Sequence, residues 1–166
     1  MKEDLNNKEA VDKLISLVKE INTAIFVTEL TKTPLQSRPM SVQEIDDQGN
    51  LWFISSATSN KNFEILKDDQ VQLFFANNSS SQYISIYGSA TIYTDQQKID
   101  ELWTPVAKAW FEEGKTDPNV TVIKVTPSDA YYWDTKDGKV ISLIKMAGSA
   151  LFGNTADIGV EGKLKL

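Results

Sequence analysis

The chain has 166 residues, of which 41% are hydrophobic, 24% charged and 10% aromatic, a composition typical of a globular protein and not of a disordered or fibrous one. It contains no cysteine and no histidine, so disulfides, Cys or His metal sites, thiolate nucleophiles and imidazole catalysis are excluded. The net charge of −6 disfavours nucleic acid and anionic membranes as partners. Without an apolar leader or a membrane-spanning run, the sequence predicts a cytoplasmic protein.

The first predicted element is an amphipathic helix, followed by strands. Apolar residues recur at helical spacing from Val11 to Ile21, and Asn6 with Glu9 three residues later is typical of a capped helix start. After Ala24, β-branched and aromatic runs separated by turn residues predict five strands, at 24–30, 36–45, 51–55, 71–77 and 82–94. We expect a hairpin turn at 46–50 and a polar loop at 77–81.

Two segments of this β-rich region have a distinct pattern. Residues 59–69 predict a short helix, with Ser59 as its cap and Phe63 and Leu66 on its apolar side. In the strand at 82–94, alternate residues from Ile84 to Ile92 share one face, and Gly88 on that face indicates a close approach by another segment.

The last third of the chain mixes helical and strand patterns. Asp95 is expected to cap a helix whose course is interrupted at Pro105 and which stops by Gly114. Two strands at 120–126 and 129–135 are expected on either side of Pro127, followed by a turn at 137–138, helical spacing at 140–151 and a tail at 153–166. Seven short strands with few helices predict a mainly β, predominantly antiparallel barrel or sandwich with peripheral helices, forming a single domain over residues 1–166.

Arg38 is the only arginine in the chain, and it lies in Ser37-Arg38-Pro39-Met40. A guanidinium provides a planar fork for a phosphate or a conjugated ring edge, which lysine does not. Pro39 favours an edge strand or a bulge, where backbone groups can face a ligand. The alternative is that Arg38 is simply a solvated strand residue.

A second candidate is the hydroxyl-rich segment from Trp52 to Lys61, where a strand leads into a helix start. Its hydroxyl groups, the free amides of a helix N-terminus and the ammonium of Lys61 together offer many donors to an anion. The alternative is a Ser/Thr-rich turn that only caps its own helix.

Aromatic residues provide a third set of candidates. Trp52, Trp103, Trp110 and Trp133 could stack on a flat ligand, although such residues more often fill a core or a subunit interface. Gln82 and Tyr83 begin the longest strand just after a polar loop, where side chains can reach a ligand at a barrel mouth or can serve only to start the strand.

Several segments then occur in a recognisable order: Arg38-Pro39-Met40, residues 52–61, Gly88-Ser89-Ala90, Leu102-Trp103-Thr104-Pro105, Trp110-Phe111 with Gly114, Asp117-Pro118 and Tyr132-Trp133-Asp134. In this order, over nearly the whole chain, they resemble the general stress protein branch of the pyridoxamine 5′-phosphate oxidase-like FMN-binding split barrels.

The resemblance implies a homodimer of Greek-key, antiparallel split β-barrels with FMN at the subunit interface. Arg38, Pro39 and Met40 would lie along the flavin and its ribityl chain, Ile54 and Ser55 would offer backbone and hydroxyl contacts, and Asn60 with Lys61 would meet the phosphate. Gln82 or Tyr83 would contact the ring, and Trp110 or Trp133 would cover it from the partner subunit.

The chain also departs from the family pattern. True pyridoxamine-phosphate oxidases resemble one another in an Arg-x-His element that holds the substrate phosphate, and this chain has no histidine and its arginine stands at 38. That activity is therefore not expected. Three hypotheses remain: an FMN-dependent oxidoreductase acting on an unidentified small molecule, a non-catalytic flavin-binding or sensor dimer, and a structural dimer without cofactor. FAD or a deazaflavin in place of FMN also remains open.

Overall fold

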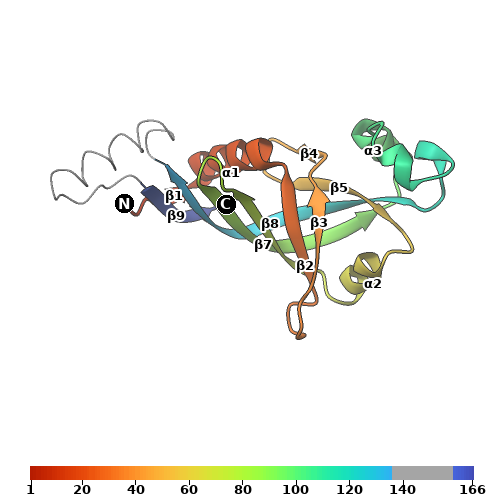
Figure 1. Ribbon diagram of the computed structural model, residues 1–166, viewed down its shortest axis with the longest axis horizontal. Helices are drawn as coiled ribbons and strands as arrows, with labels where there is room; N and C mark the ends of the chain where they lie inside the picture. The colour runs from red at the N-terminus through yellow and green to blue at the C-terminus, as the bar shows by residue number, and fades with distance from the viewer. Residues whose placement is uncertain (136–158) are drawn as a thin grey trace.

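The computed structural model describes residues 1–135 and 159–166, so the turn predicted at 137–138 and the helical pattern predicted at 140–151 lie outside the described residues. The described part is mostly β, as predicted (Figure 1). Its strands are β1 (Leu5–Asn6), β2 (Thr23–Thr28), β3 (Gln36–Ser41), β4 (Glu44–Ile45), β5 (Leu51–Ser56), β6 (Gln70–Asn77), β7 (Gln82–Tyr93), β8 (Val120–Thr135) and β9 (Gly159–Lys165). Its helices are α1 (Asn7–Ile21), α2 (Asn60–Lys67) and α3 (Gln96–Leu102), with the 3₁₀ turns η1 (Ala107–Trp110) and η2 (Gly114–Thr116).

The sheet curls around the main hydrophobic core, and a second, smaller core lies near α3. Neighbouring strands run in the order β3-β2-β6-β7-β8, and the first half of β8 also pairs with β5, which pairs with β4. Since β3 and β4 are joined by only two residues, this path begins and ends on the same stretch of chain, and the sheet wraps into a barrel. All of these pairings are antiparallel, while β9 and β1 extend the second half of β8 and pair with each other in parallel.

Strand β8 corrects the prediction of two strands separated by Pro127. It is a single strand of 16 residues that pairs with β7 on both sides of an irregularity. Tyr87 pairs with Asp129 and Gly88 with Pro127, so Ser128 is an extra, bulged residue. The predicted close approach at Gly88 is confirmed, since a Cβ added there would lie 2.3 Å from the carbonyl oxygen of Thr126.

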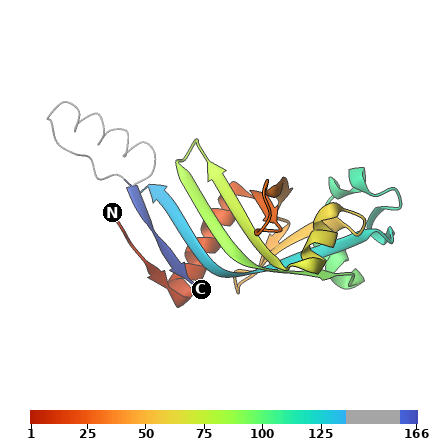
Figure 2. The same ribbon diagram turned by 90° about the horizontal axis from the view of Figure 1, so that it is seen from below.

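The predicted opening helix is confirmed as α1, which lies against the sheet (Figure 2). Its buried face consists of Ala10, Leu14, Leu17 and Val18, which join the inward-facing strand residues in the main core. Asn6 stands at the N-cap position, although its side chain makes no capping bond. The amphipathic pattern of the helix is therefore explained by burial against the barrel.

The predicted short helix is confirmed as α2, but its orientation differs from the prediction. The helix buries Asn62 and Ile65, whereas Phe63 and Leu66 are 51% and 74% exposed. The polar side chain of Asn62 faces the barrel because it has hydrogen-bonding partners there, and this turns the two apolar residues toward solvent.

Among the remaining elements, those that depend on neighbouring residues were predicted, and those that depend on pairing between distant residues were not. Asp95 caps α3 as expected, accepting a hydrogen bond of 2.9 Å from the backbone amide of Lys98. The predicted tail contains strand β9, and β1 was not predicted at all, because both depend on pairing between residues far apart in the sequence. None of the helices described has the length and apolar character needed to cross a membrane.

Candidate functional site

The start of α2 is fixed against the barrel by a buried polar network. The Ser55 hydroxyl on β5 donates a hydrogen bond of 2.6 Å to Oδ1 of Asn62, and Nδ2 of Asn62 donates one of 2.9 Å to Oγ1 of Thr121 on β8. Thr121 in turn donates to the carbonyl oxygen of Ser55 at 3.0 Å. All three residues are buried, so the network satisfies their polar groups and holds the helix start between two strands.

The first backbone amides of α2 are not capped by a side chain. Ser59 occupies the N-cap position but makes no capping bond; its hydroxyl donates to Oδ1 of Asn62 at 3.2 Å instead. The free amides at a helix N-terminus carry a partial positive charge that favours an anion. Asn60, the first residue of the helix, is exposed beside them.

Arg38 lies on β3 and reaches the side of α2. One guanidinium nitrogen, Nη1, donates to Oγ1 of Thr28 at 2.6 Å, and the other, Nη2, forms an ion pair of 2.8 Å with Oε2 of Glu64. The hydroxyl of Thr28 donates to the same Glu64 oxygen at 2.5 Å, which closes a triangle of polar groups. The Arg38 and Glu64 side chains are 23% and 12% exposed, and Thr28 is fully buried.

Glu64 is ionised in this arrangement. Burial alone would raise the pKa of its carboxyl, but hydrogen bonds from Thr28 and Arg38 and the charges of Arg38 and Lys32 outweigh burial and lower that pKa. The solitary arginine of the sequence is thus matched by a carboxylate that neutralises it within the fold.

Lys61 lies one helical turn before Glu64 and is half-buried. Burial, followed by the positive charge of Arg38, lowers the pKa of its ammonium, and the nearby charge of Glu64 only partly offsets this. Within residues 1–135 and 159–166, no hydrogen bond or ion pair is made by the Lys61 side chain. Together Thr28, Arg38, Lys61 and Glu64 form a cluster with excess positive charge, which we call the α2 site.

The other residues predicted around Arg38 and Ser55 point in different directions. Met40 lies on the same face of β3 as Arg38 but belongs to the main core, and Pro39 is exposed on the opposite face beside Ile25. Ile54 packs with the second, smaller core near α3, on the face of β5 opposite to Ser55. Only backbone groups of these residues are available to a ligand on the Arg38 side.

Gln82, Tyr83 and Trp133 form a separate group. Tyr83 lies opposite Trp133 in the pairing of β7 with β8, and strands β2 and β6 separate this group from Arg38. The side-chain amide of Gln82 donates to Glu20 at 3.1 Å, and the Tyr83 hydroxyl donates to Asn78 at 3.1 Å. Trp110 lies elsewhere, on η1, with 81% of its surface exposed. The fold of one chain therefore brings Arg38, Ser55, Asn60 and Lys61 into one region, but not Gln82, Tyr83, Trp110 or Trp133.

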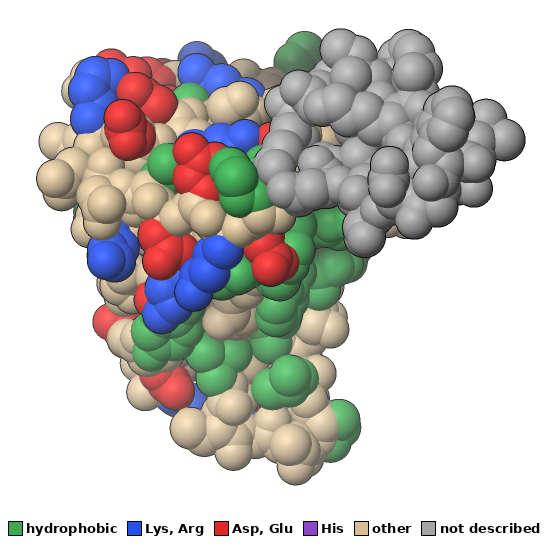
Figure 3. Space-filling model, turned by 90° about the vertical axis from the view of Figure 1, so that its left-hand side faces the viewer, with side chains coloured by type: hydrophobic (Ala, Val, Ile, Leu, Met, Phe, Trp, Pro, Cys, Tyr) green, Lys and Arg blue, Asp and Glu red, His purple; other side chains and the backbone are tan. Residues whose placement is uncertain are grey.

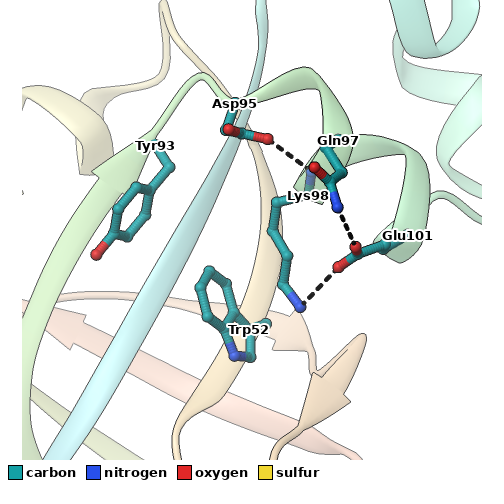
Figure 4. Close-up of a pocket in the computed structure, with 6 residues that line it drawn as sticks. All are labelled: Trp52, Tyr93, Asp95, Gln97, Lys98 and Glu101. Carbon is teal, nitrogen blue, oxygen red and sulfur yellow. Dashed lines mark hydrogen bonds and ion pairs between the residues drawn. The ribbon is translucent and has the colours of Figure 1, made fainter.

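A pocket of about 280 Å³ lies between β5, β7 and α3 (Figure 4), and of the candidate residues considered in the sequence analysis it contains only Trp52. We call it the Trp52 pocket; its lining residues are Trp52, Tyr93, Asp95, Gln97, Lys98 and Glu101.

The polar groups of the Trp52 pocket are already matched. Lys98 extends over the Trp52 ring, with its Nζ 4.4 Å from the ring centroid, and forms ion pairs of 2.9 Å with Glu44 and 3.3 Å with Glu101. Asp95 is engaged as the cap of α3. We therefore attribute the pocket to the packing of α3 on β5.

Sequence reasoning missed three residues of this region: Thr28, Asn62 and Glu64. The spacing of Lys61 and Glu64 places them on adjacent turns of a helix, but nothing in the sequence shows that Arg38 lies beside them. No cluster of three acidic residues suited to a metal ion occurs in the described part of the chain.

The comparisons with known proteins agree with this architecture. The family model described as "Pyridoxamine 5'-phosphate oxidase like" matches residues 9–157. The protein bli-3 of Neurospora crassa is 26% identical over 160 residues, covering 90% of this chain and 77% of that protein. General stress protein 26 of Bacillus subtilis is 28% identical over 61 residues, covering 37% of this chain and 43% of that protein.

Two solved structures are also similar. A candidate general stress protein 26 from Jannaschia sp. CCS1 has a TM-score of 0.79 at 24% identity, covering 95% of this chain and 98% of that chain, and shows that the split-barrel fold is shared. The general stress FMN/FAD-binding protein of Xanthomonas citri has a TM-score of 0.66 at 29% identity, covering 77% of this chain and 90% of that chain.

Proposed function

The chain belongs to the pyridoxamine 5′-phosphate oxidase-like family, and on this premise we propose that it is a cytoplasmic, homodimeric FMN-binding protein of the general stress protein type. We propose further that residues 1–166 form one flavin-binding domain and that it acts as an oxidoreductase on a small molecule. The proposal takes support from its similarity to a protein described as binding FMN or FAD.

The observation that carries the proposal is the surplus positive charge of the α2 site. Lys61 is a half-buried ammonium whose pKa is lowered by burial and by the charge of Arg38, which is an unfavourable state for a lysine with no function. A phosphate group beside Lys61 would offset both effects on this pKa, because its negative charge stabilises the charged ammonium. The uncapped amides at the start of α2 would offer further donors to the same group.

The residues that would hold FMN follow from this placement. Lys61 and Asn60 would bind the phosphate, the Ser55 region would position the helix start, and the β3 backbone at Arg38, Pro39 and Met40 would lie along the ribityl chain and ring. FMN is preferred over FAD here because its terminal phosphate carries a charge of about −1.5 to −2 that one free ammonium and a helix N-terminus can match. When bound, FMN would supply the electron chemistry that a chain without histidine or cysteine lacks.

A second copy of the chain would bring the remaining predicted residues to this pocket. Hydrophobic side chains gather in a band on the end of the molecule seen in Figure 3. Large apolar residues are exposed on four adjacent strands, with Ile25 paired to Phe74 and Tyr83 paired to Trp133. Burying such a surface against a second copy would favour a dimer and would carry Gln82, Tyr83, Trp110 or Trp133 toward the partner's flavin.

The experiment that tests the proposal is the spectrum and mass of the molecule that co-purifies with the protein, followed by titration of the cofactor-free protein with FMN. A yellow protein that bleaches with a nicotinamide donor supports the oxidoreductase. A yellow protein without turnover supports the non-catalytic flavin-binding dimer. A colourless protein that does not bind added FMN contradicts both.

A further inference from the structure

The carboxylate of Glu64 is the charged partner of Arg38 in the described structure. Both guanidinium donors described above are engaged, one by Thr28 and one by Glu64, at 2.6 and 2.8 Å. Because the hydroxyl of Thr28 also donates to Glu64, the carboxylate is held by two partners. Arg38 is therefore already paired within the fold, which its isolated position in the sequence does not indicate.

Glu64 also acts on Lys61. The two residues are three positions apart on α2, and the carboxylate is close enough to oppose the effects of burial and of Arg38 on the lysine. An anion that binds to Lys61 is therefore placed near a fixed negative charge. At an effective dielectric constant of about 20, two like charges about 8 Å apart repel each other by an amount equivalent to about a tenfold change in affinity or more.

We propose that Glu64 is an internal competitor of the ligand phosphate: it holds Arg38 in the ligand-free protein and lowers the affinity of the site for phosphorylated flavin. The inference rests on the proposed function and deepens it, because it assigns one residue to setting how strongly the site holds its cofactor. It makes Arg38 a residue that positions α2 through Glu64, and leaves Lys61 as the cation that meets the phosphate.

The proposal predicts a gain of binding, which a damaged fold would not produce. Glu64→Gln keeps the size of the side chain and a hydrogen-bonding oxygen but removes the charge. We expect the affinity for FMN to rise about tenfold, while the affinity for riboflavin, which lacks the phosphate, changes by less than about twofold. Fluorescence titration of both ligands against the variant and the unmodified protein measures this ratio.

The matched control is Glu101→Gln, which removes a carboxylate from a cation on α3. It should leave both affinities unchanged. An FMN affinity that is unchanged or weaker in Glu64→Gln, or a gain shared equally by riboflavin, overturns the inference. If Glu64→Gln does not fold, Glu64→Ala carries the same expectation.

A probe without flavin separates failure of this inference from failure of the proposed function. If the unmodified protein and both variants bind neither FMN nor riboflavin, the proposed function is wrong. Inorganic phosphate then still tests Glu64: at constant ionic strength it should raise the melting temperature of Glu64→Gln more than that of the unmodified protein. Equal shifts, or none, overturn the inference.

Discussion

The α2 site and the Trp52 pocket both place cations beside a short helix, but they differ in how the charges are matched. In the Trp52 pocket, Lys98 is paired with two carboxylates and covers an aromatic ring. In the α2 site, one carboxylate serves Arg38, and Lys61 remains half-buried with a lowered pKa. The comparison shows that the charges of the visible pocket are matched within the protein, whereas the α2 site keeps a half-buried charge without a partner among the described residues, which is why the proposed function is placed there.

The N-termini of α2 and α3 also differ in whether the protein itself supplies a partner for the first backbone amides. The N-terminus of α3 is capped by Asp95, a side chain of the protein itself, whereas that of α2 has no side-chain cap although Ser59 stands in position to provide one. Ser59 is instead directed to Asn62. The same local motif therefore completes one helix and leaves the other able to accept a ligand anion.

The largest expected effect comes from removing both cations of the α2 site. Arg38→Ala combined with Lys61→Ala should weaken FMN binding by about 2–5 kcal/mol, because a charge-assisted contact is worth about 1.5–3 kcal/mol and the loss of Arg38 also leaves Glu64 unbalanced. Isothermal titration of the cofactor-free protein measures this loss, and size-exclusion chromatography should show the same oligomeric state.

The control removes the same net charge from the other region. Lys98→Ala with Lys124→Ala takes away the two ammonium groups near the Trp52 ring, 4.4 and 5.6 Å from its centroid. FMN affinity should stay within a few tenths of a kcal/mol. Equal losses in the two double variants would mean that net charge, and not the α2 site, governs binding.

A smaller effect is expected from the network beneath α2. Asn62→Ala removes the acceptor of the buried Ser55 hydroxyl and the donor to Oγ1 of Thr121, and it should reduce the free energy of unfolding by about 1–3 kcal/mol, as measured by urea denaturation. FMN affinity should fall as well, because the helix start loses its anchor. Asp95→Ala is the comparison: it should cost about 0.5–2 kcal/mol of stability as a lost cap, without changing FMN affinity. An Asn62→Ala variant with full stability would show that the network does not hold α2.

The smallest expected effect is a change in melting temperature that has opposite signs for substitutions of Lys61 and Lys98. Lys61→Met should raise the melting temperature of the ligand-free protein, because the charged form of Lys61 is disfavoured in the fold. This gain should be largest at neutral pH, should begin to fall as the pH passes the lowered pKa of Lys61 in the fold, and should vanish above the ordinary pKa of lysine, where the side chain is uncharged in both the folded and the unfolded state.

Lys98→Met should do the reverse. Burial opposes the charge of Lys98, but the hydrogen bonds that its ammonium donates to Glu44 and Glu101 outweigh burial and raise the pKa of the ammonium. The stability that this charge contributes is present at neutral pH and is lost as the pH rises through the raised pKa. Melting curves of both variants between neutral and alkaline pH test the pair. If both variants shift the melting temperature in the same direction, the charges of Lys61 and Lys98 do not differ in their effect on stability, and the contrast between the two regions is wrong.

Local patterns in the sequence were enough to predict much of the fold. The apolar spacing of α1, the alternation along β7 and the Asp95 cap each depend on neighbours in the chain, and each is found in the structure. Pro127 misled the prediction because pairing with β7 on both sides carries the strand through a bulge. Strand β9 was missed because glycines interrupt its pattern; Gly162 is required there, since a Cβ would lie 1.8 Å from the carbonyl oxygen of Glu3.

The residues of the candidate site also differ in whether local sequence could identify them. Arg38 and Lys61 could be singled out from residue type and from the helix start that follows Ser55. Their relation to Glu64 and Thr28 could not, because it depends on how α2 lies across β2 and β3. Likewise, Asn62 reads as a polar residue of a short helix, and only the strands beneath it make it a buried anchor.

The pairing of β9 with β1 has a consequence for the kinetics of folding. It joins segments at the two extremes of the described chain, with Leu5 opposite Leu164, and the backbone amide of Glu3 donates to Glu161 at 2.8 Å. Contacts between residues so far apart in the sequence stabilise the fold only after the chain has lost the conformational entropy of closing a very large loop. We therefore expect the barrel strands to assemble first and the pairing of β1 with β9 to form after them.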